Sequence, residues 1–281
     1  MNRIEFTEAP PVGRNYRKLF FARKPGVPEN GKLPEMEMCL HNTAVDHNIL
    51  KKYNSLCKIN DEDTLPVTFP YVLAGPLHLS MLSHEHFPLK GAGLLHLRNR
   101  IQCKKNIGIN DQFSLTVRTA ETRFRPQGFE FDLITELQID NEILWTCKST
   151  LLSRGKFSKE DPASEDESLF EKLTGENLTS GFKVPGNAGR AYAKVCKDYN
   201  PIHIATPLAW IFGFKKAIAH GMWVSARALG ELGLAHTARE FDLAFKGPVY
   251  TGSQVSIQKK EEHFNLFCQG NSRAVILGRV L

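Results

Sequence analysis

The chain has 281 residues, of which 42% are hydrophobic and 23% are charged. This balance excludes a disordered chain, and the length suffices for two domains of ordinary size or one large one. The formal net charge of +6 favours anionic partners only weakly, because a surplus of this size also serves solubility.

Residues 1–40 combine several prolines and glycines with a basic cluster, which is typical of an extended arm without regular structure. Charges and prolines stand near the start, where a secretory signal needs a continuous apolar run, and no later segment is apolar enough to span a bilayer. We therefore expect a cytoplasmic protein that does not bind membranes. No known nucleic-acid-binding fold accompanies the basic arm, so nucleic acid is not an expected partner.

The six cysteines are far apart and form no C-x-x-C pair, so the sequence predicts reduced thiols without a disulfide framework. His84 and His86 form an H-x-H pair that has no plausible third ligand. We expect neither a metal nor any other cofactor.

The first half of the chain reads as helices followed by an antiparallel meander. Helical spacing of apolar residues predicts helices over 45–56 and 71–83. Alternating and β-branched runs, separated by turn sequences, predict strands over 94–103, 113–124, 129–139 and 143–152. Residues 155–181 then turn acidic and are typical of a linker.

The second half repeats this plan, with a predicted helix over 222–232 and strands over 241–245, 254–260, 263–269 and 274–281. Laying 103–113 on 245–255 aligns a lysine, a branched apolar residue and a glutamine before an apolar residue. Such a similarity can arise by chance, but a helix before each meander favours a duplicated unit. Asp242 and Lys246 are expected to be solvated on a strand edge.

The most informative stretch is 192–223, which reads YAKVCKDYNPIHIATPLAWIFGFKKAIAHGMW. Residues 198–201, Asp-Tyr-Asn-Pro, predict a turn, because Asp and Asn satisfy nearby backbone groups and proline fixes its own φ. A turn can aim Asp198 and His203 into one cleft, where a carboxylate and an imidazole hold one water and move its protons. Asn200 is expected to hold this turn in place.

A predicted helix begins at Gly221, directly after His220. Unpaired N–H groups at a helix start stabilise a developing oxyanion, and glycine lets a thioester carbonyl approach the backbone closely. Ser225 follows without a G-x-S-x-G motif and on the core-facing side of this helix, so an acyl-serine mechanism is disfavoured. His220 is expected to be structural.

The stretch resembles the MaoC-like (R)-specific enoyl-CoA hydratases, the hydratase 2 family, at Tyr192, Asp198-x-Asn200-Pro201-Ile202-His203, Ala209, Gly213-Phe214 and Ile218-Ala219-His220-Gly221. The resemblance implies an α+β double hot-dog fold, with two antiparallel sheets each wrapped on a central helix. It also implies that Asp198 and His203 are the catalytic dyad and that Gly221 supplies an oxyanion-hole N–H. Asn200 and Tyr192 would support the dyad from behind.

One position departs from the family pattern. Lys197 stands directly before Asp198, where the family usually has glycine. A lysine there can alter the turn, change the electrostatics of the dyad, or contact a phosphate or the thioester of the substrate.

The expected domains are a non-catalytic hot-dog unit with its arm over 1–154, an acidic linker over 155–181 and a catalytic unit over 182–281. Leu77 and Met81 of the first unit are expected to line the acyl pocket. The two units pair within one chain, as a monomer or a homodimer.

The expected function is reversible hydration of trans-2-enoyl-CoA to (R)-3-hydroxyacyl-CoA. An alternative is a dehydratase acting on 3-hydroxyacyl chains bound to CoA or to an acyl-carrier protein. A second alternative is a non-catalytic acyl-thioester-binding protein, which the lysine at 197 would favour.

Overall fold

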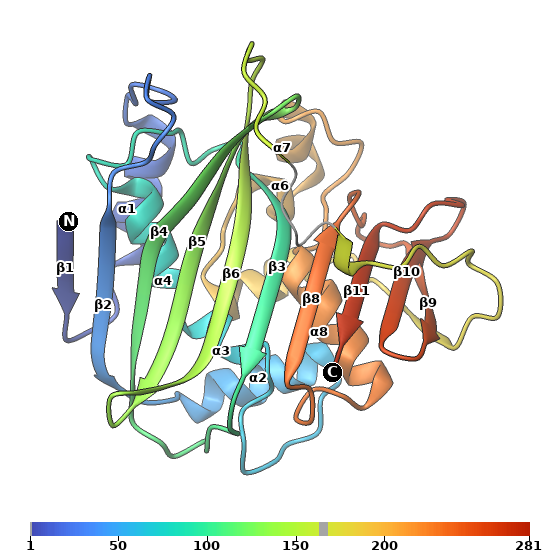
Figure 1. Ribbon diagram of the computed structural model, residues 1–281. Coiled ribbons are helices and arrows are strands. Elements are labelled where there is room, and N and C mark those ends of the chain that lie inside the picture. The colour runs from blue at the N-terminus through green and yellow to red at the C-terminus, as the bar shows by residue number, and fades with distance from the viewer. Residues whose placement is uncertain (1, 163–167) are drawn as a thin grey trace.

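The computed structural model describes residues 2–162 and 168–281. Within them, eleven strands form one sheet in the order β1-β2-β4-β5-β6-β3-β8-β11-β10-β9-β7 (Figure 1). The strands are β1 Asn2–Phe6, β2 Met36–Thr43, β3 Leu95–Cys103, β4 Phe113–Arg125, β5 Gly128–Ile139, β6 Glu142–Arg154, β7 Ser180–Lys183, β8 Glu240–Phe245, β9 Gln254–Lys260, β10 His263–Cys268 and β11 Ile276–Val280.

Helices lie along one face of this sheet (Figure 1). They are α1 Val12–Phe21, α2 His47–Cys57, α3 Phe69–Leu73, α4 Gly75–Ser83, α5 Ala188–Cys196, α6 Pro201–Ile204, α7 Thr206–Ile211 and α8 Gly221–Leu232. The single helix expected over 71–83 is divided between α3 and α4, and the break at Ala74 comes directly before Gly75 and Pro76. Among the described residues, no helix combines the length and hydrophobicity that a membrane span requires.

The order of the strands is symmetric about the β3–β8 pair. Outward from this centre, β6, β5, β4 and β2 on one side correspond to β11, β10, β9 and β7 on the other. Residues 98–102 of β3 pair antiparallel with residues 240–244 of β8, which joins the two half-sheets. Each half-sheet carries helices on the same face, so the predicted double hot-dog fold is confirmed, with its two sheets fused into one.

The two halves also share a core. The indole N–H of Trp223 in α8 donates to the backbone oxygen of Leu56 in α2 at 3.1 Å. At the crossing of these helices, a Cβ added to Gly230 would lie 2.3 Å from the backbone oxygen of Cys57. Only glycine allows this approach, so the helices of the two halves pack directly on each other.

The first forty residues correct the expectation of an irregular arm. Strand β1 pairs parallel with β2. Helix α1 follows and packs on α4. Its Leu19 also contacts Gly91, which lies beyond the end of α4, so closely that a Cβ added to Gly91 would be 2.0 Å from Leu19 Cδ1. Met36, Met38 and Leu40 of β2 are buried in the core, whereas Phe21 at the end of α1 is 83% exposed. The proline count alone does not reveal this burial.

A second correction concerns Asp242. Its side chain is 1% exposed, because β8 is a central strand of the sheet and not an edge. The guanidinium groups of Arg279 and Arg100 each lie 3.5 Å from its carboxylate oxygens. A buried carboxylate needs such partners, since leaving it unpaired in the core costs several kcal/mol, on the order of 3 to 5.

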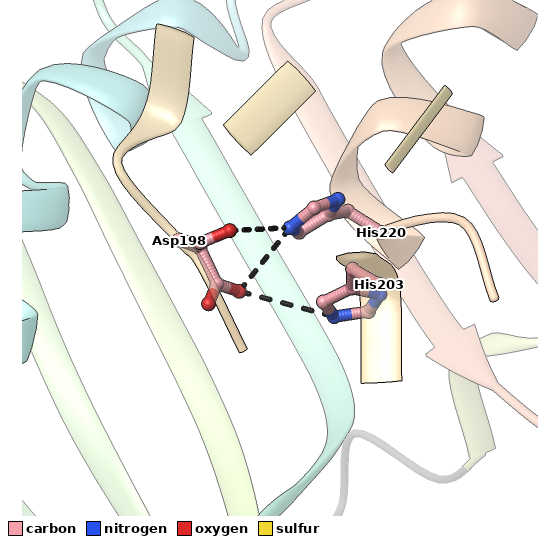
Figure 2. Close-up of side chains that lie close together, drawn as sticks. All are labelled: Asp198, His203 and His220. Carbon is pink, nitrogen blue, oxygen red and sulfur yellow. Dashed lines mark hydrogen bonds and ion pairs between the residues drawn. The ribbon is translucent and has the colours of Figure 1, made fainter. Parts of the chain in front are cut away.

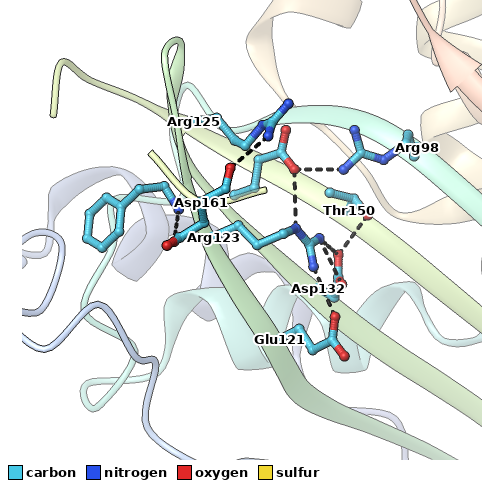
Figure 3. Close-up of polar contacts among 9 residues, drawn as sticks. Arg98, Glu121, Arg123, Arg125, Asp132, Thr150 and Asp161 are labelled. Atoms are coloured by element: carbon cyan, nitrogen blue, oxygen red, sulfur yellow. Dashed lines mark hydrogen bonds and ion pairs between the residues drawn. The ribbon is translucent and has the colours of Figure 1, made fainter. Parts of the chain in front are cut away.

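The sheet also carries a network of buried charges, drawn in Figure 3. Arg98 donates to Glu130 at 2.6 Å, and Arg123 binds both oxygens of Asp132 at 2.9 Å. Thr150 donates to the same carboxylate at 2.7 Å. These paired groups link β3, β4, β5 and β6.

The start of the expected linker is attached to this region. The carboxylate of Asp161 accepts the Phe124 N–H at 2.9 Å, and its backbone oxygen accepts from Arg125 at 3.0 Å (Figure 3). Glu165, Asp166 and Glu167 of the acidic stretch lie outside the described residues.

Candidate active site

The predicted turn follows helix α5 and places its carboxylate at the end of that helix. Lys197 is the C-cap residue of α5 and has φ 61°, the left-handed conformation. Glycine adopts this conformation without steric cost, which explains physically why a glycine suits this position. The Lys197 ammonium donates back to the Lys194 oxygen at 2.9 Å. Asn200 then caps α6, with its side chain accepting the Ile202 N–H at 3.4 Å.

Three ionisable side chains meet after this turn (Figure 2). The carboxylate Oδ2 of Asp198 lies 3.9 Å from His203 Nε2 and 3.5 Å from His220 Nε2. The two imidazole rings stack, with centroids 3.7 Å apart and planes inclined by 25°. The sequence placed Asp198 and His203 together, and the structure adds His220 as a third member.

Hydrogen bonds to backbone carbonyls define the tautomers of the two imidazoles. His203 Nδ1 lies 2.9 Å from the Ile218 oxygen. A carbonyl oxygen only accepts hydrogen bonds, so Nδ1 carries the proton. In the neutral ring the lone pair of Nε2 then points toward Asp198. His220 Nε2 donates to the Asp198 backbone oxygen at 3.0 Å. One imidazole can therefore accept a proton at Nε2, while the other holds the turn.

Burial keeps both imidazoles neutral. It lowers the pKa of His203, although the Asp198 carboxylate and the Ile218 carbonyl act against the shift. Burial likewise lowers the pKa of His220 to about 3, and the stacked His203 ring adds to this effect. Both rings are therefore uncharged near neutral pH.

The carboxylate is held in its ionised form. Burial acts to raise the pKa of Asp198, but the imidazoles of His220 and His203 act in the opposite direction. Hydrogen bonds from the Asn200 N–H and the Tyr16 hydroxyl favour the anion further. The effects that favour the anion prevail, so the pKa of Asp198 lies below its ordinary value. Its side chain is 45% exposed and faces the cavity as an anion.

The same three residues contain enough donor atoms for a metal, since one ligand atom from each lies within 4.8 Å of the others. The stacking of His203 on His220 argues against this use. Lone pairs of nearly parallel rings run side by side and do not converge on one point, as tetrahedral or octahedral coordination requires. The arrangement fits proton transfer better than metal binding.

Gly221 opens α8 beside this cluster, with His220 as the N-cap residue. As the first helical residue it has no intrahelical partner for its N–H, and the helix dipole places partial positive charge there. Ser225 in the next turn is fully buried and donates to the Gly221 oxygen at 2.9 Å. Its hydroxyl is thereby directed away from the cavity, consistent with the expectation that it is no nucleophile.

A cavity of about 490 Å³ lies in front of these groups, at the junction of the two halves. Its volume is in the range of pockets that hold small organic ligands. Asp198, His203, Gly221 and Phe245 are among the residues that line it. Six leucines of the first half also line it and form its apolar wall: Leu79, Leu82, Leu94, Leu95, Leu97 and Leu151.

The wall from the first half differs from the expected one. Leu77 and Met81 are fully buried in the core and do not line the cavity, whereas Leu79 and Leu82 of the same helix do. The spacing of apolar residues showed a helix but not which of its apolar sides faces the sheet, because the apolar residues of α4 are not confined to one face. The expectation for Leu77 and Met81 is therefore wrong.

Three polar aromatic residues of the first half also reach the cavity and had no signal in the sequence. The ring of Tyr71 lies between His78, at a centroid distance of 5.0 Å, and His96, at 6.0 Å. Burial lowers the pKa of His78 to about 3 and that of His96 to about 4. His96 contacts the Phe245 ring at 4.9 Å, which brings β3 and β8 together at the site.

Tyr192 lies beneath the site. It is 2% exposed, and its ring contacts those of His220 at 5.1 Å and Tyr53 at 6.2 Å. Burial raises the pKa of its phenol far above the ordinary value, so the hydroxyl stays protonated. The residue packs behind the cluster, in the position expected of a supporting group.

Comparisons with known proteins show similarity to MaoC-like dehydratases. Residues 178–276 match the model of the MaoC like domain. The chain is 26% identical over 208 residues to 3-hydroxyacyl-thioester dehydratase X of Mycobacterium tuberculosis, which covers 74% of each protein. The crystal structure of HtdX from that organism has a TM-score of 0.74 at 22% identity and covers 87% of this chain and 98% of that one. A MaoC-like dehydratase from Phytophthora capsici has a TM-score of 0.65 at 17% identity, covering 91% and 97%.

Proposed function

We propose that this chain catalyses the reversible (R)-specific hydration of trans-2-enoyl thioesters, because residues 178–276 match the MaoC like domain and the chain is similar to a 3-hydroxyacyl-thioester dehydratase. The observation that carries the proposal is the placement of an anionic Asp198 and a neutral His203 Nε2 beside the N-terminus of α8. These are the groups that addition of water to a conjugated thioester needs: a base, a proton carrier and an oxyanion site.

The substrate enters with its thioester carbonyl at the Gly221 N–H. This N–H and the positive end of the α8 dipole polarise the carbonyl, which makes carbon 3 electrophilic. The acyl chain then lies along the leucine wall of the first half, defined by Leu79, Leu82, Leu94, Leu95, Leu97 and Leu151. Burial of methylene groups there contributes about 0.8 kcal/mol each.

One proton moves from the water to carbon 2 by way of Asp198 and His203. Asp198 takes a proton from the bound water while the oxygen forms its bond to carbon 3, and the π electrons move to the thioester oxygen as an enolate. The proton passes to His203 Nε2, whose lone pair faces the carboxylate, and then to carbon 2 as the carbonyl reforms. Both transfers occur on one face of the substrate, so the addition is syn.

The reverse direction uses the same groups. Removal of the proton at carbon 2 and loss of the 3-hydroxyl as water regenerate the enoyl thioester. The similarity to 3-hydroxyacyl-thioester dehydratase X of Mycobacterium tuberculosis favours this direction as the second candidate function. The carrier of the acyl group, CoA or acyl-carrier protein, does not depend on this direction.

The proposal is tested by following the absorbance of the conjugated enoyl thioester with crotonyl-CoA and with longer 2-enoyl-CoA substrates, and by determining the handedness of the 3-hydroxyacyl product. Asp198→Asn and His203→Ala should each lose about 100- to 10,000-fold in turnover, since each removes a group that transfers a proton. The exposed Asp63→Asn serves as the matched carboxylate control.

Circular dichroism should show that the two site variants keep the fold, because both residues border a cavity. Near-wild-type turnover in either folded variant would refute the dyad. Formation of the (S)-product would refute the stereochemical part of the proposal. An inactive wild-type protein that still binds acyl-CoA would instead indicate an acyl-thioester-binding protein.

A further inference from the structure

Helix α1 lies outside both hot-dog units in the sequence, yet it reaches the candidate active site. The hydroxyl of Tyr16 donates to Asp198 Oδ1 at 3.0 Å and accepts the backbone N–H of Tyr199 at 2.6 Å. Tyr16 and Leu19 from this helix both line the cavity. A residue 182 positions away from the proposed base is therefore part of its immediate surroundings.

We propose that Tyr16 is a positioning residue for Asp198, and that helix α1 is consequently a functional component of the active site. The inference rests on the proposed function, because it assigns Asp198 the part of the base. It goes beyond that function in giving a catalytic purpose to a segment that belongs to neither half of the duplicated fold.

The two carboxylate oxygens of Asp198 have different surroundings. Oδ1 accepts both the Tyr16 hydroxyl and the Asn200 N–H, each at 3.0 Å. Oδ2 faces the Nε2 atoms of His203 and His220. With Oδ1 occupied by two donors, the carboxylate cannot rotate without breaking hydrogen bonds. Its remaining basic oxygen is thereby kept toward the imidazoles and the water site.

The hydroxyl of Tyr16 also matters for the charge of the carboxylate. His203 and His220 are neutral near pH 7 because burial lowers their pKa values, so neither supplies a positive charge at that pH. The hydrogen bonds from the Tyr16 hydroxyl and the Asn200 N–H favour the anion whether or not the imidazoles are charged. Tyr16 keeps the proton that it donates to Asp198, because burial and the adjacent carboxylate raise its own pKa far above neutral.

The same hydroxyl joins the helix to the turn. By accepting the Tyr199 N–H while donating to Asp198, it spans the first two residues of the predicted 198–201 turn. The Tyr16 and Tyr199 rings meet edge to face, with centroids 6.1 Å apart. Beyond the end of α1, the Lys24 ammonium donates to the His84 oxygen, which ties the segment after α1 to the end of α4.

The test is Tyr16→Phe in the full-length protein, with kcat, KM and the pH dependence of kcat/KM measured on crotonyl-CoA. We expect kcat to fall by about tenfold and the acidic limb of kcat/KM to move up by about one pH unit, since a hydrogen bond to a charged group is lost. KM should stay within about twofold, because the acyl wall is unchanged. The control is Phe20→Leu, which loosens α1 at a ring stacked 6.2 Å from Tyr16 but keeps the hydroxyl.

Two results would overturn the inference: an unchanged acidic limb in a folded, active Tyr16→Phe variant, or the same shift in Phe20→Leu. If Tyr16→Phe misfolds, the NMR titration of the Asp198 carboxyl can be compared between the wild type and Phe20→Leu. If the Asp198 carboxyl of the wild type titrates like an ordinary aspartate, the positioning role is refuted. A wild type that is inactive on every thioester would count against the proposed function, whereas the titration would still report on Tyr16.

Discussion

The ring of Phe245 lies directly on Gly221. A Cβ added to Gly221 would be 2.6 Å from Cε1 of the ring and 2.9 Å from Cδ1, closer than carbon atoms approach in proteins. Phe245 ends the central strand β8, and Gly221 begins α8. The contact thus sets the distance between the sheet and the helix N-terminus that is proposed to hold the thioester oxygen.

Gly221→Ala should therefore impair turnover without unfolding the protein. The methyl group must displace either the Phe245 ring or the first turn of α8, and a misplaced oxyanion donor costs about 10- to 1000-fold in kcat. The measurement is kcat on crotonyl-CoA. A second substitution, Phe245→Leu, should restore part of the loss by removing the colliding ring atoms; failure to do so would show that the methyl group acts in another way.

The leucine wall should set the longest acyl chain that is accepted. Leu82→Phe is expected to reduce activity on long 2-enoyl-CoA substrates and to spare crotonyl-CoA, because the larger ring occupies cavity space beyond the short chain. Met81→Leu is the control, since Met81 is fully buried in the core and the exchange conserves volume. Equal losses on all chain lengths would place the acyl group elsewhere.

Buried histidines should make the protein sensitive to acid. Burial lowers the pKa of His78 and His220 to about 3 and that of His96 to about 4, whereas the unfolded chain binds these protons near pH 6.5. Unfolding therefore takes up protons below pH 6.5. The free energy of unfolding has its full value above pH 6.5. It falls as the pH drops toward 4, by up to about 1.4 kcal/mol per pH unit for each histidine.

Urea unfolding at pH 7 and pH 5 measures this loss. In His78→Gln the loss between the two pH values should be smaller, because one proton fewer is taken up on unfolding. The exposed His47→Gln provides the control for removal of a histidine as such. An equal pH dependence in wild type and His78→Gln would contradict the prediction.

Lys197→Gly tests the departure from the family pattern. Glycine adopts the left-handed conformation at φ 61° without the steric strain of a side chain, so the variant should gain about 0.5 to 1 kcal/mol of stability. If the ammonium contacts a phosphate of the substrate, KM for CoA thioesters should rise at low salt and less so at high salt. An effect on KM that does not depend on salt would point to the turn itself.

The sequence predicted those features of the site that depend on neighbours along the chain. The Asp-x-Asn-Pro turn and the helix start at Gly221 are local, and the strands of both meanders are close to their observed bounds because alternation marks them. Pairing over long distances leaves no such mark. Tyr16 meets Asp198 across 182 residues, and no spacing rule connects them.

Features that depend on packing between distant elements were not predicted, for a related reason. Asp242 looked like a solvated edge residue because strand order cannot be read from one strand, and only the β3–β8 pairing puts it in the core. The stacking of His220 on His203 could not be predicted either, because it depends on how α8 lies against the turn. Which apolar side of α4 faces the cavity was likewise decided by tertiary packing.

The central position of β3 has a consequence for the protein during its synthesis. The strand ends at Cys103, whereas its partner β8 begins only at Glu240, 137 residues later. At ordinary rates of translation, roughly ten to thirty seconds pass before the ribosome has delivered that partner. For this period the newly made first half exposes an open strand edge, which can recruit a strand from another nascent chain. Stalled or truncated translation products that end between these two strands should therefore be the most aggregation-prone form of this polypeptide.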